Sequence, residues 1–539
     1  MNNTGGFFLK KRAVSVFMIL LTLFGSVAFR MEKLATDDTQ AAHVPSSKSI
    51  EIAQIRGTIY DCKLRTLTNS EPEYTAVAKP TAQAAIRLEA MLSPEVLEAA
   101  RERMGRGSPV AYKTDRPTAG DEDVKIVATP KRYSKSRLAC HVIGYTDSQG
   151  RGISGIEKAY DTLLNSGNST ITARFFADAS GDMLLGSGIE ILTEGNSNTG
   201  VVLTIDRTLQ HITEEALDAA GVEKGCAVVM EVESGAIRAM ASRPSFDADN
   251  IAASLNDADS PLINRALLPF SVGSVFKPVV AAAALESGIT ADFEYECTGN
   301  AEYSGVVFNC HKKEGHGKVD MKSAVANSCN TYFAALAMEV GADKLIQTAE
   351  KFGFGTETVL ANGIKSKAGN LPKVAELDSK AAIANISFGQ GSLTATPVQI
   401  CTMTAAIARG GEYIPAYLTE GEVGENGEMI RTEHYTERKK IISSSTARLL
   451  TDFLRQVVTN GSGKRAESEV VTSAGKTATA QTGKSDENGE IYNAWFAGFF
   501  PAESPKYAVV ILRENGGEGA VSCAPVFKEI SEKIYEEEK

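Results

Sequence analysis

The segment Pro269–Glu286, PFSVGSVFKPVVAAAALE, reads as the start of a buried helix and carries a serine and a lysine where its apolar run begins. Ser274 and Lys277 are three residues apart, so on a helix they share one face and the amine can reach the hydroxyl. A buried lysine with a lowered pKa can activate a serine nucleophile. The alternative is a purely structural interpretation, in which the serine caps the helix and the lysine is exposed to solvent. The same S-x-x-K spacing recurs at Ser473 and Lys476, so the pattern alone decides nothing.

The proline that follows this pair is compatible with a helix. Amides in the first turn of a helix have no intrahelical partner, so Pro278 is tolerated if the helix begins at Ser274. The free amide of Ser274 would then point into a cleft, where it can stabilise an oxyanion.

A second polar motif lies in NSCNTYF, which contains Ser328 and Asn330. The serine hydroxyl can relay a proton between a base and a leaving amine, and the carboxamide can hold a substrate carbonyl. The S-x-N spacing also occurs at Ser166 and Asn168, so this motif is weak when taken alone.

A third motif, SAGKTATAQTG, lies on a predicted strand and supplies Lys476, Thr477 and Thr479. An amine and neighbouring hydroxyls suit a substrate carboxylate. The amide of Thr479 can complete an oxyanion pair with that of Ser274. The three motifs in this order predict one active site built from distant parts of the chain.

The chain around these motifs predicts an α+β fold. Strands are expected at both ends of the region after residue 200, with a long, largely helical insert between them and a closing helix over Ala524–Glu536. We expect an antiparallel sheet with terminal helices on one face, a helical subdomain on the other, and the site in the cleft between them. The predicted strands are Val201–Ile205, the hairpin within CAVVMEVESGAIRAMAS (226–242), Val470–Gln481, Tyr492–Pro501 and Tyr507–Glu514.

Length and composition limit the function classes. The chain has 539 residues, which is enough for two or three domains. It is 43% hydrophobic and 23% charged, as expected of a globular protein. Its formal net charge is −11, so nucleic acid is not expected as a partner.

The N-terminus contains a membrane signal. LKKR (9–12) precedes an apolar run over Ala13–Phe29, and Arg30 follows. Basic residues before such a run predict a cytoplasmic N-terminus and an exported remainder. A cleaved signal peptide is the alternative, but no A-x-A-like site follows Phe29, so a retained anchor is favoured.

The eight cysteines are scattered and do not form a disulfide scaffold. Cys297 and Cys310 are close enough in sequence to pair. With His311 and His316 they resemble a loose zinc set, although the spacing fits no standard finger. We therefore expect a disulfide or free thiols here, and neither a metal nor a cofactor in the protein.

The three motifs in their order resemble those of class B penicillin-binding proteins, which are peptidoglycan D,D-transpeptidases. The resemblance runs from the anchor to the C-terminus. It also includes the segments RGTIYD, GISGIEKAYD, LTIDRTLQ, SGAIRAMASRPSFD, HGKVD, SFGQGSLTATPVQ and AWFAGFFP.

The resemblance implies a membrane anchor, a non-catalytic pedestal and a C-terminal transpeptidase domain with the penicillin-binding, serine β-lactamase-like fold. The corresponding segments are a cytoplasmic tail (1–12), the anchor (13–29), a linker (30–49), the pedestal (50–200) and the catalytic domain (201–539). The protein would be a single-pass protein of the bacterial cell membrane with an extracytoplasmic catalytic domain. The family also suggests a membrane glycan polymerase as partner.

Roles carry over by motif. Ser274 corresponds to the acylated nucleophile and Lys277 to its base, Ser328 and Asn330 to the second motif, and Lys476 to the third. The implied substrate is a stem peptide ending in D-Ala-D-Ala, which β-lactams mimic, and the implied acceptor is an amine of a neighbouring stem peptide. Thr477 and Thr479 then join Asn330 in substrate binding.

Two positions depart from the family pattern. The third motif is usually K-T-G, but Ala478 occupies the glycine position. By strand alternation its methyl shares the face of Lys476 and could crowd the cleft. Cys62 follows RGTIYD where the family usually has a basic residue.

Three other functions remain as alternatives. A β-lactamase or β-lactam sensor on the same fold would need a base for deacylation, and no E-x-x-L-N glutamate follows Asn330. A catalytically dead scaffold of the wall-synthesis complex has only Ala478 in its favour. A Ser-His-Asp hydrolase lacks a G-x-S-x-G elbow.

Overall fold

The computed structural model divides the chain into two compact units, which are described separately. Unit 1 contains residues 1–54, 72–129 and 169–194, and unit 2 contains residues 55–71, 130–168 and 195–539. The structure describes residues 5–36, 46–118, 120–166, 168–178, 183–184, 186–195, 198–432, 438–486 and 489–539.

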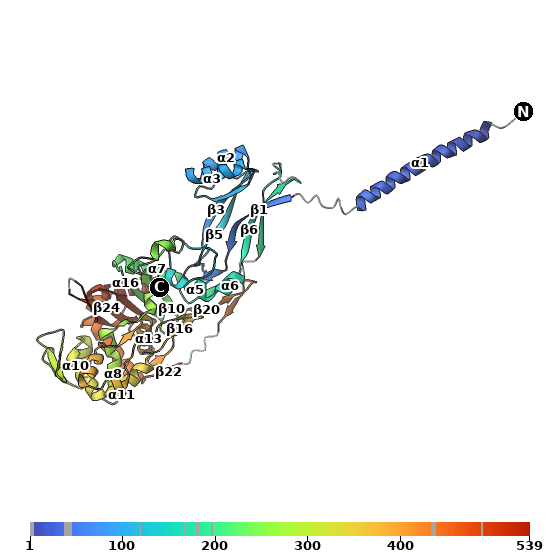
Figure 1. The fold of residues 1–539 in the computed structure, drawn as a ribbon. Helices are drawn as coiled ribbons and strands as arrows, with labels where there is room; N and C mark the ends of the chain where they lie inside the picture. Colours follow the sequence, from blue (N-terminus) through green and yellow to red (C-terminus); the bar gives the residue numbers. More distant parts are fainter. Residues whose placement is uncertain are drawn as a thin grey trace. The chain divides into compact units, whose positions relative to one another are not determined.

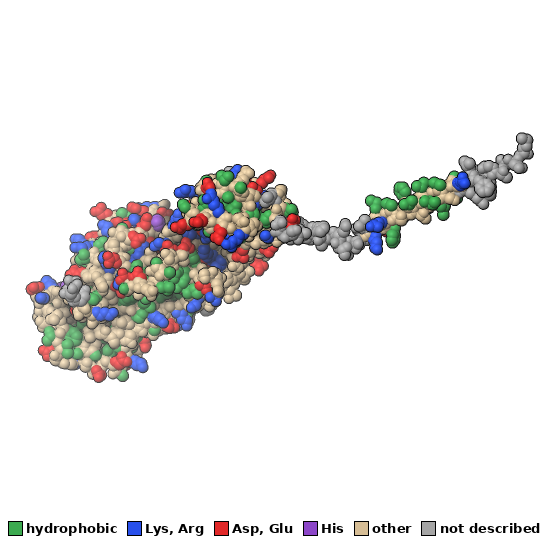
Figure 2. Space-filling view, turned by 45° about the horizontal axis from the view of Figure 1, so that its top comes forward, with side chains coloured by type: hydrophobic (Ala, Val, Ile, Leu, Met, Phe, Trp, Pro, Cys, Tyr) green, Lys and Arg blue, Asp and Glu red, His purple; other side chains and the backbone are tan. Residues whose placement is uncertain are grey.

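Helix α1 (Gly5–Thr36) begins unit 1 and is long and apolar enough to cross a membrane over Arg12–Lys33, a span of 22 residues. Its apolar side chains over residues 12–33 are exposed, and Figure 2 shows them along the helix. The linker predicted over 30–49 is partly regular: residues 30–36 belong to α1 and residues 46–49 to a strand, while 37–45 lie outside the described residues.

The remaining described residues of unit 1 form two three-stranded sheets and two helices (Figure 1). In one sheet, strands of the order β4-β3-β5 pack against α2 and α3 around buried Leu88, Met91 and Val110. Thr81 caps α2 by accepting from the amide of Ala84. The elements are β1 (Ser46–Ile55), β3 (Glu71–Ala78), α2 (Ala82–Glu89), α3 (Pro94–Gly105), β4 (Val110–Lys113), β5 (Val124–Lys131), β6 (Ser169–Ala177) and β7 (Glu190–Gly195), with β1-β6-β7 as the second sheet.

Unit 2 is built on a five-stranded antiparallel sheet of the order β10-β9-β25-β24-β23 (Figure 1). These strands confirm the predicted hairpin and the three predicted C-terminal strands. Their bounds are β9 (Gly225–Glu231), β10 (Ile237–Arg243), β23 (Ala474–Asp486), β24 (Gly489–Phe500) and β25 (Tyr507–Arg513).

Side-chain alternation gives the sheet two buried faces. In β25, Val509 and Ile511 face α7 (Arg207–Ala219) and α16 (Ala524–Glu537). Val510 and Leu512 face the main core instead, with α8 and α13. The expected arrangement of terminal helices on one face and a helical subdomain on the other is therefore confirmed.

The insert between the two strand groups is mainly helical, as predicted. Helix α8 is almost uniformly apolar, and helices α10, α11 and α14 surround it. The helices are α8 (Lys277–Glu286), α9 (Met321–Ala326), α10 (Asn330–Val340), α11 (Ala342–Lys351), α12 (Lys380–Ser387), α13 (Pro397–Ala408) and α14 (Ser444–Thr459).

Short elements complete unit 2. Before the insert these are β2 (Thr58–Tyr60), α4 (Cys140–Ile143), α5 (Gly155–Ala159), α6 (Asp161–Ser166), β8 (Gly200–Leu203), η1 (Ile251–Ser254), η2 (Arg265–Leu267) and β11 (Phe270–Ser271). From there on they are η3 (Gly273–Phe276), β12 (Tyr295–Cys297), β13 (Asn300–Tyr303), β14 (Val306–Asn309), β15 (Gly317–Val319), β16 (Val359–Ala361), β17 (Ile364–Lys365), η4 (Val374–Glu376), β18 (Thr394–Ala395), β19 (Glu412–Tyr413), β20 (Thr419–Val423), β21 (Met429–Arg431), β22 (Lys439–Lys440), η5 (Lys464–Ala466) and α15 (Gly519–Ser522).

The strand predicted over Val201–Ile205 forms as β8 but does not join the five-stranded sheet. It pairs in parallel with β2 and antiparallel with β20, in a sheet of the order β2-β8-β20-β21. Residues 55–71 and 130–168, which were expected within the continuous pedestal 50–200, thus pack in the same unit as residues 195–539.

A buried ion cluster joins these early segments of unit 2 to one another. Arg56 of RGTIYD pairs with Glu157 at 2.8 Å and with Asp161 at 2.7 Å, and Glu157 also pairs with Arg132 at 2.7 Å. The Glu157 side chain is fully buried. Because a buried carboxylate needs paired charge, this cluster fixes GISGIEKAYD against RGTIYD.

Candidate active site

The turn that carries Ser274 lies against the edge strand β23. Gly273 has φ +58°, and a Cβ built there would lie 3.0 Å from Ala480 Cβ and 3.3 Å from Thr479 O. The Gly273 amide donates to Gly389 O at 2.9 Å. Glycine is required here because the turn needs a left-handed residue at close approach. Ser274 is half-buried in the first turn, η3, which leads directly into α8.

Lys277 connects the first motif to the second. Its Nζ donates to Ser328 O at 2.6 Å, to Ser328 Oγ at 3.1 Å and to Asn330 Oδ1 at 2.7 Å. The Asn330 carboxamide is held from its other end, since Nδ2 donates to Asn309 O at 3.1 Å. The amine and the carboxamide therefore fix each other's orientation.

Ser328 lies between the two lysine amines. Lys476 Nζ contacts Ser328 Oγ at 3.0 Å and also donates to Thr477 O at 3.0 Å. Ser328 itself has φ +53°, a left-handed conformation that is unfavourable for a residue with a side chain. Its hydroxyl thus joins motifs two and three, and a proton can pass along the line from Lys277 through Ser328 to Lys476.

Both amines are buried without a carboxylate partner among the described residues. Lys277 is 0% and Lys476 is 1% exposed. Burial lowers the pKa of Lys277 to about 7. Burial, reinforced by the charge of Lys277, lowers the pKa of Lys476 well below its usual value. An amine that loses its proton near neutral pH is suited to act as a general base.

The hydroxyls of the third motif have other partners in this structure. Thr477 Oγ1 lies 3.0 Å from Ser462 Oγ, and Thr479 Oγ1 accepts from the Gly519 amide at 3.4 Å. The structure therefore brings Lys277, Ser328, Asn330 and Lys476 together by hydrogen bonds. The two threonine hydroxyls and the hydroxyl of Ser274 are not joined to this group by a hydrogen bond among the described residues.

Ala478 does not project into open space. It is 3% exposed, belongs to the main hydrophobic core and lies opposite Trp495 in the β23–β24 register. The Trp495 indole in turn donates to Ser271 O at 3.0 Å, just before the serine turn. The methyl that replaces glycine is therefore packed among core side chains.

The contacts of two further polar residues around the site have no signal in the sequence. Ser462 contacts Thr477 from the loop after α14, and Cys329 lies between the two residues that contact Lys277. The position of Cys329 within S-x-N was visible in the sequence, but its neighbours, Cys310 and Thr331, became evident only in the fold. No disulfide joins Cys297 and Cys310.

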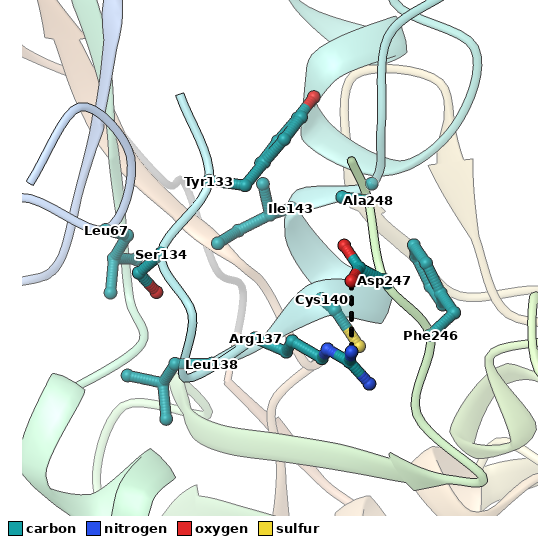
Figure 3. A pocket seen from close by; sticks show the side chains of 11 residues that line it. Leu67, Tyr133, Ser134, Arg137, Leu138, Cys140, Ile143, Phe246, Asp247 and Ala248 are labelled. Carbon is teal, nitrogen blue, oxygen red and sulfur yellow. Dashed lines mark hydrogen bonds and ion pairs between the residues drawn. The ribbon is translucent and has the colours of Figure 1, made fainter. Parts of the chain in front are cut away.

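A separate pocket in unit 2 is shown in Figure 3, where Arg137 and Asp247 form an ion pair of 3.0 Å near Cys140 and Phe246. Its internal space is about 20 Å³, roughly the room that a single water molecule needs. It contains none of the predicted site residues and is too small for a peptide.

Comparisons with known proteins agree with this architecture. A family model described as the penicillin binding protein transpeptidase domain matches residues 225–532. The chain is 31% identical over 401 residues to stage V sporulation protein D of Bacillus subtilis, covering 71% of this chain and 60% of that protein. It is 30% identical over 455 residues to peptidoglycan D,D-transpeptidase MrdA of Acinetobacter baumannii, covering 73% and 65%.

A solved structure extends the similarity to the fold. The D,D-transpeptidase domain of a peptidoglycan glycosyltransferase from Eggerthella lenta superposes with a TM-score of 0.65 at 27% identity, covering 90% of this chain and 98% of that one. The chain spans 60–65% of the length of the two curated relatives. The matched family model covers more than half of the chain and contains all three motifs, so this protein belongs to the penicillin-binding protein transpeptidase family.

Proposed function

We propose that the protein is a peptidoglycan D,D-transpeptidase that works through an acyl-enzyme on Ser274. The observation that carries the proposal is the meeting of Lys277, Ser328, Asn330 and Lys476 beside the serine turn. Two buried amines with lowered pKa values and a serine in a left-handed conformation lie together here, and such features concentrate at functional sites.

Acylation begins with the neutral amine of Lys277. It takes the proton of Ser274 Oγ as the oxygen attacks the penultimate carbonyl of a stem peptide that ends in D-Ala-D-Ala. The amides of Ser274 and Thr479 stabilise the oxyanion that forms. The amide of Ser274 is available because it lies in the first turn of a helix, and the amide of Thr479 lies on the edge strand β23.

Collapse of this intermediate expels the terminal D-Ala. The leaving amine needs a proton, and the hydroxyl of Ser328 supplies it from the line of amines that it bridges. An amine of a neighbouring stem peptide then attacks the acyl-enzyme and forms the cross-link. A β-lactam undergoes the first step but leaves Ser274 acylated.

Substrate binding falls to Asn330 and to the third motif. The carboxamide of Asn330 is oriented by Lys277 and Asn309, so it can hold a backbone group of the stem peptide. The terminal carboxylate would be the acidic partner that Lys476 lacks among the described residues, and its negative charge would favour the protonated amine. Thr477 and Thr479 contribute once their hydroxyls turn from Ser462 and Gly519 toward the ligand.

The remaining assignments concern location and partners. We propose that α1 anchors the protein in the cell membrane, with the basic residues 10–12 on the cytoplasmic side and residues 46–539 outside. Unit 1 would then serve as the non-catalytic pedestal. A membrane glycan polymerase would be its partner, since cross-linking needs newly made strands.

Labelling the full-length chain with a fluorescent penicillin tests this proposal. We expect covalent labelling, one adduct in the intact mass, and an adducted peptide that contains Ser274. Ser274→Ala should abolish the label, while Ser473→Ala, the serine of the second S-x-x-K sequence, should retain it. The adduct should be long-lived, because a transpeptidase, unlike a β-lactamase, does not hydrolyse its acyl-enzyme rapidly.

Each contrary outcome selects another function. A short-lived adduct on Ser274 would indicate a β-lactamase, and a folded protein with no adduct would indicate a scaffold. A label that survives Ser274→Ala at the same peptide would remove the nucleophile assignment.

A further inference from the structure

Four potential metal ligands meet beside the second motif. Cys297 ends β12, Cys310 follows β14, His316 precedes β15 and Cys329 caps α10. Their ligand atoms, three sulfurs and one imidazole nitrogen, all lie within 4.8 Å of one another. The set differs from the loose zinc set considered from sequence, because Cys329 takes the place of His311.

The spacing of these atoms fits a tetrahedral zinc ion. His316 Nδ1 lies 3.6 Å from Cys297 Sγ and 3.5 Å from Cys310 Sγ, and Cys310 Sγ lies 3.9 Å from Cys329 Sγ. Zn–S bonds of about 2.3 Å and Zn–N bonds of about 2.0 Å in a tetrahedron place neighbouring ligand atoms about 3.5–3.8 Å apart. Thiolates with one imidazole favour Zn²⁺ over Mg²⁺ or Ca²⁺.

Hydrogen bonds around the sulfurs match those of metal thiolates. Thr331 is fully buried, and its hydroxyl donates to Cys297 Sγ at 3.1 Å. The backbone amides of Lys312 and Asn330 are directed at Cys310 Sγ. Such donors to ligand sulfurs are the usual surroundings of a metal site.

The segment that carries the ligands has almost no hydrophobic core of its own. Between Glu294 and Lys318, the only buried side chains other than glycine are those of Cys297 and Cys310. The exposed hairpin β13–β14 extends from this segment. A stretch of this kind needs a cross-link to hold one conformation, and a metal ion is one such cross-link.

Two glycines allow the loops of this segment to approach each other closely. Gly299 and Gly315 have φ of +99° and +84°, and a Cβ at either position would collide with a backbone carbonyl, of Lys313 and Cys297 respectively. The Cys310 amide donates to Gly299 O at 2.8 Å. The backbone is thus folded tightly around the four ligand atoms.

We propose that Cys297, Cys310, His316 and Cys329 bind one Zn²⁺ that holds this segment and positions the second motif. Cys329 lies between Ser328 and Asn330, and Asn309, which accepts from Asn330, precedes Cys310. The ion would therefore fix both residues that contact Lys277. The four ligands act as positioning residues and take no part in proton transfer.

Zinc content tests the binding site without reference to the proposed function. The full-length chain, purified in detergent under reducing conditions and without chelator, should contain about one zinc ion per chain. Cys297→Ser and His316→Ala should lose it. Cys140→Ser should keep it, because Cys140 is a buried cysteine whose sulfur also lies near an imidazole, that of His141 at 3.3 Å, but outside the cluster.

A second measurement remains decisive if the ligand variants fail to fold. Wild-type protein loaded with Co²⁺ should show the sulfur-to-cobalt charge-transfer band and the intense visible bands of a tetrahedral thiolate site. Folded, reduced protein without zinc or without that spectrum would overturn the proposal. So would protein whose Cys310 and Cys329 are found joined as a disulfide in place of metal.

The positioning role is tested separately, by the rate of β-lactam acylation. Of the three tests, only this one depends on the proposed function. Removing zinc, or replacing Thr331 by valine, should slow β-lactam acylation by about 10–100-fold. Zn²⁺ should restore the rate in the stripped protein and Mg²⁺ should not. An unchanged acylation rate in folded protein that is shown to be free of zinc would overturn the positioning role, because the ion would then have no effect on Ser328 and Asn330.

Discussion

Unit 2 contains two buried polar clusters, one around Glu157 and one around Ser328, and only the first pairs its basic groups with a carboxylate. Around Glu157, the positive charges of Arg56 and Arg132 meet a carboxylate at 2.7–2.8 Å. Around Ser328, two lysine amines meet a hydroxyl, an amide oxygen and backbone carbonyls, and the described residues offer no carboxylate to either. The first cluster holds segments in place, while the second keeps amines easy to deprotonate.

The difference shows that a paired carboxylate, and not burial itself, separates the structural cluster from the chemical one. A paired ion keeps its charge inside a protein because the partner replaces water. An amine without an acidic partner loses that compensation, so its pKa falls. The pKa of Lys277, lowered to about 7 by burial, is the consequence that makes it useful as a base.

The largest expected effect comes from replacing Lys277 by methionine. Loss of the base should slow β-lactam acylation by about 10²–10⁴-fold. Thermal stability should change little, because the loss of the hydrogen bonds to Ser328 O and Asn330 Oδ1 offsets the removal of a desolvated amine from the core. Stopped-flow acylation and a thermal melt on the same preparation check both parts, and a fall in both would make Lys277 a structural residue.

Replacing Glu157 by alanine should have the opposite profile. It leaves Arg56 and Arg132 buried without their shared partner, which typically costs about 3–5 kcal/mol of folding free energy. Acylation per folded molecule should not change. Denaturant unfolding measures the loss, with Glu215→Gln as the control, since Glu215 pairs with His211 on the exposed face of α7.

An unchanged unfolding midpoint for Glu157→Ala would show that the paired cluster is not what holds residues 130–168 against residues 55–71. Slower acylation in the folded variant would show that the two clusters are coupled.

The smallest effect is expected at Ala478. Because its methyl is packed in the core opposite Trp495, Ala478→Gly should destabilise the protein by about 0.5–1 kcal/mol, the usual penalty for glycine inside a regular element. The acylation rate should rise or stay the same. A marked fall in the rate would mean that the methyl supports the active strand.

The strands and helices of the sheet were predictable because their signals are local. Two short apolar runs separated by the Glu233–Gly235 turn predict the β9–β10 hairpin. The apolar face of α7 follows from its helical period. The partners of β8 were not predictable, since β2 and β20 lie about 140 residues before it and about 220 after it. The two discontinuous units were not predictable either, because each combines segments that are far apart in the sequence.

The site was predictable as far as residue type and order reached. Ser274, Lys277, Ser328, Asn330 and Lys476 follow from three short motifs. The motifs did not reveal that Lys277 contacts Ser328 and Asn330 directly, or that Thr477 contacts Ser462. The cysteine spacing suggested only a local pair of Cys297 and Cys310. It could not show that Cys329 lies beside them, because Cys329 reaches them only through the packing of α10 against β12.

The pH dependence of β-lactam acylation tests the central claim most directly. If neutral Lys277 is the base, the acylation rate should rise about tenfold per pH unit below its pKa of about 7 and level off above it. Fold stability should rise with pH above that point, because the unfolded amine still binds its proton there while the folded one does not. A rate that is flat from acidic to alkaline pH in stably folded protein would contradict the account.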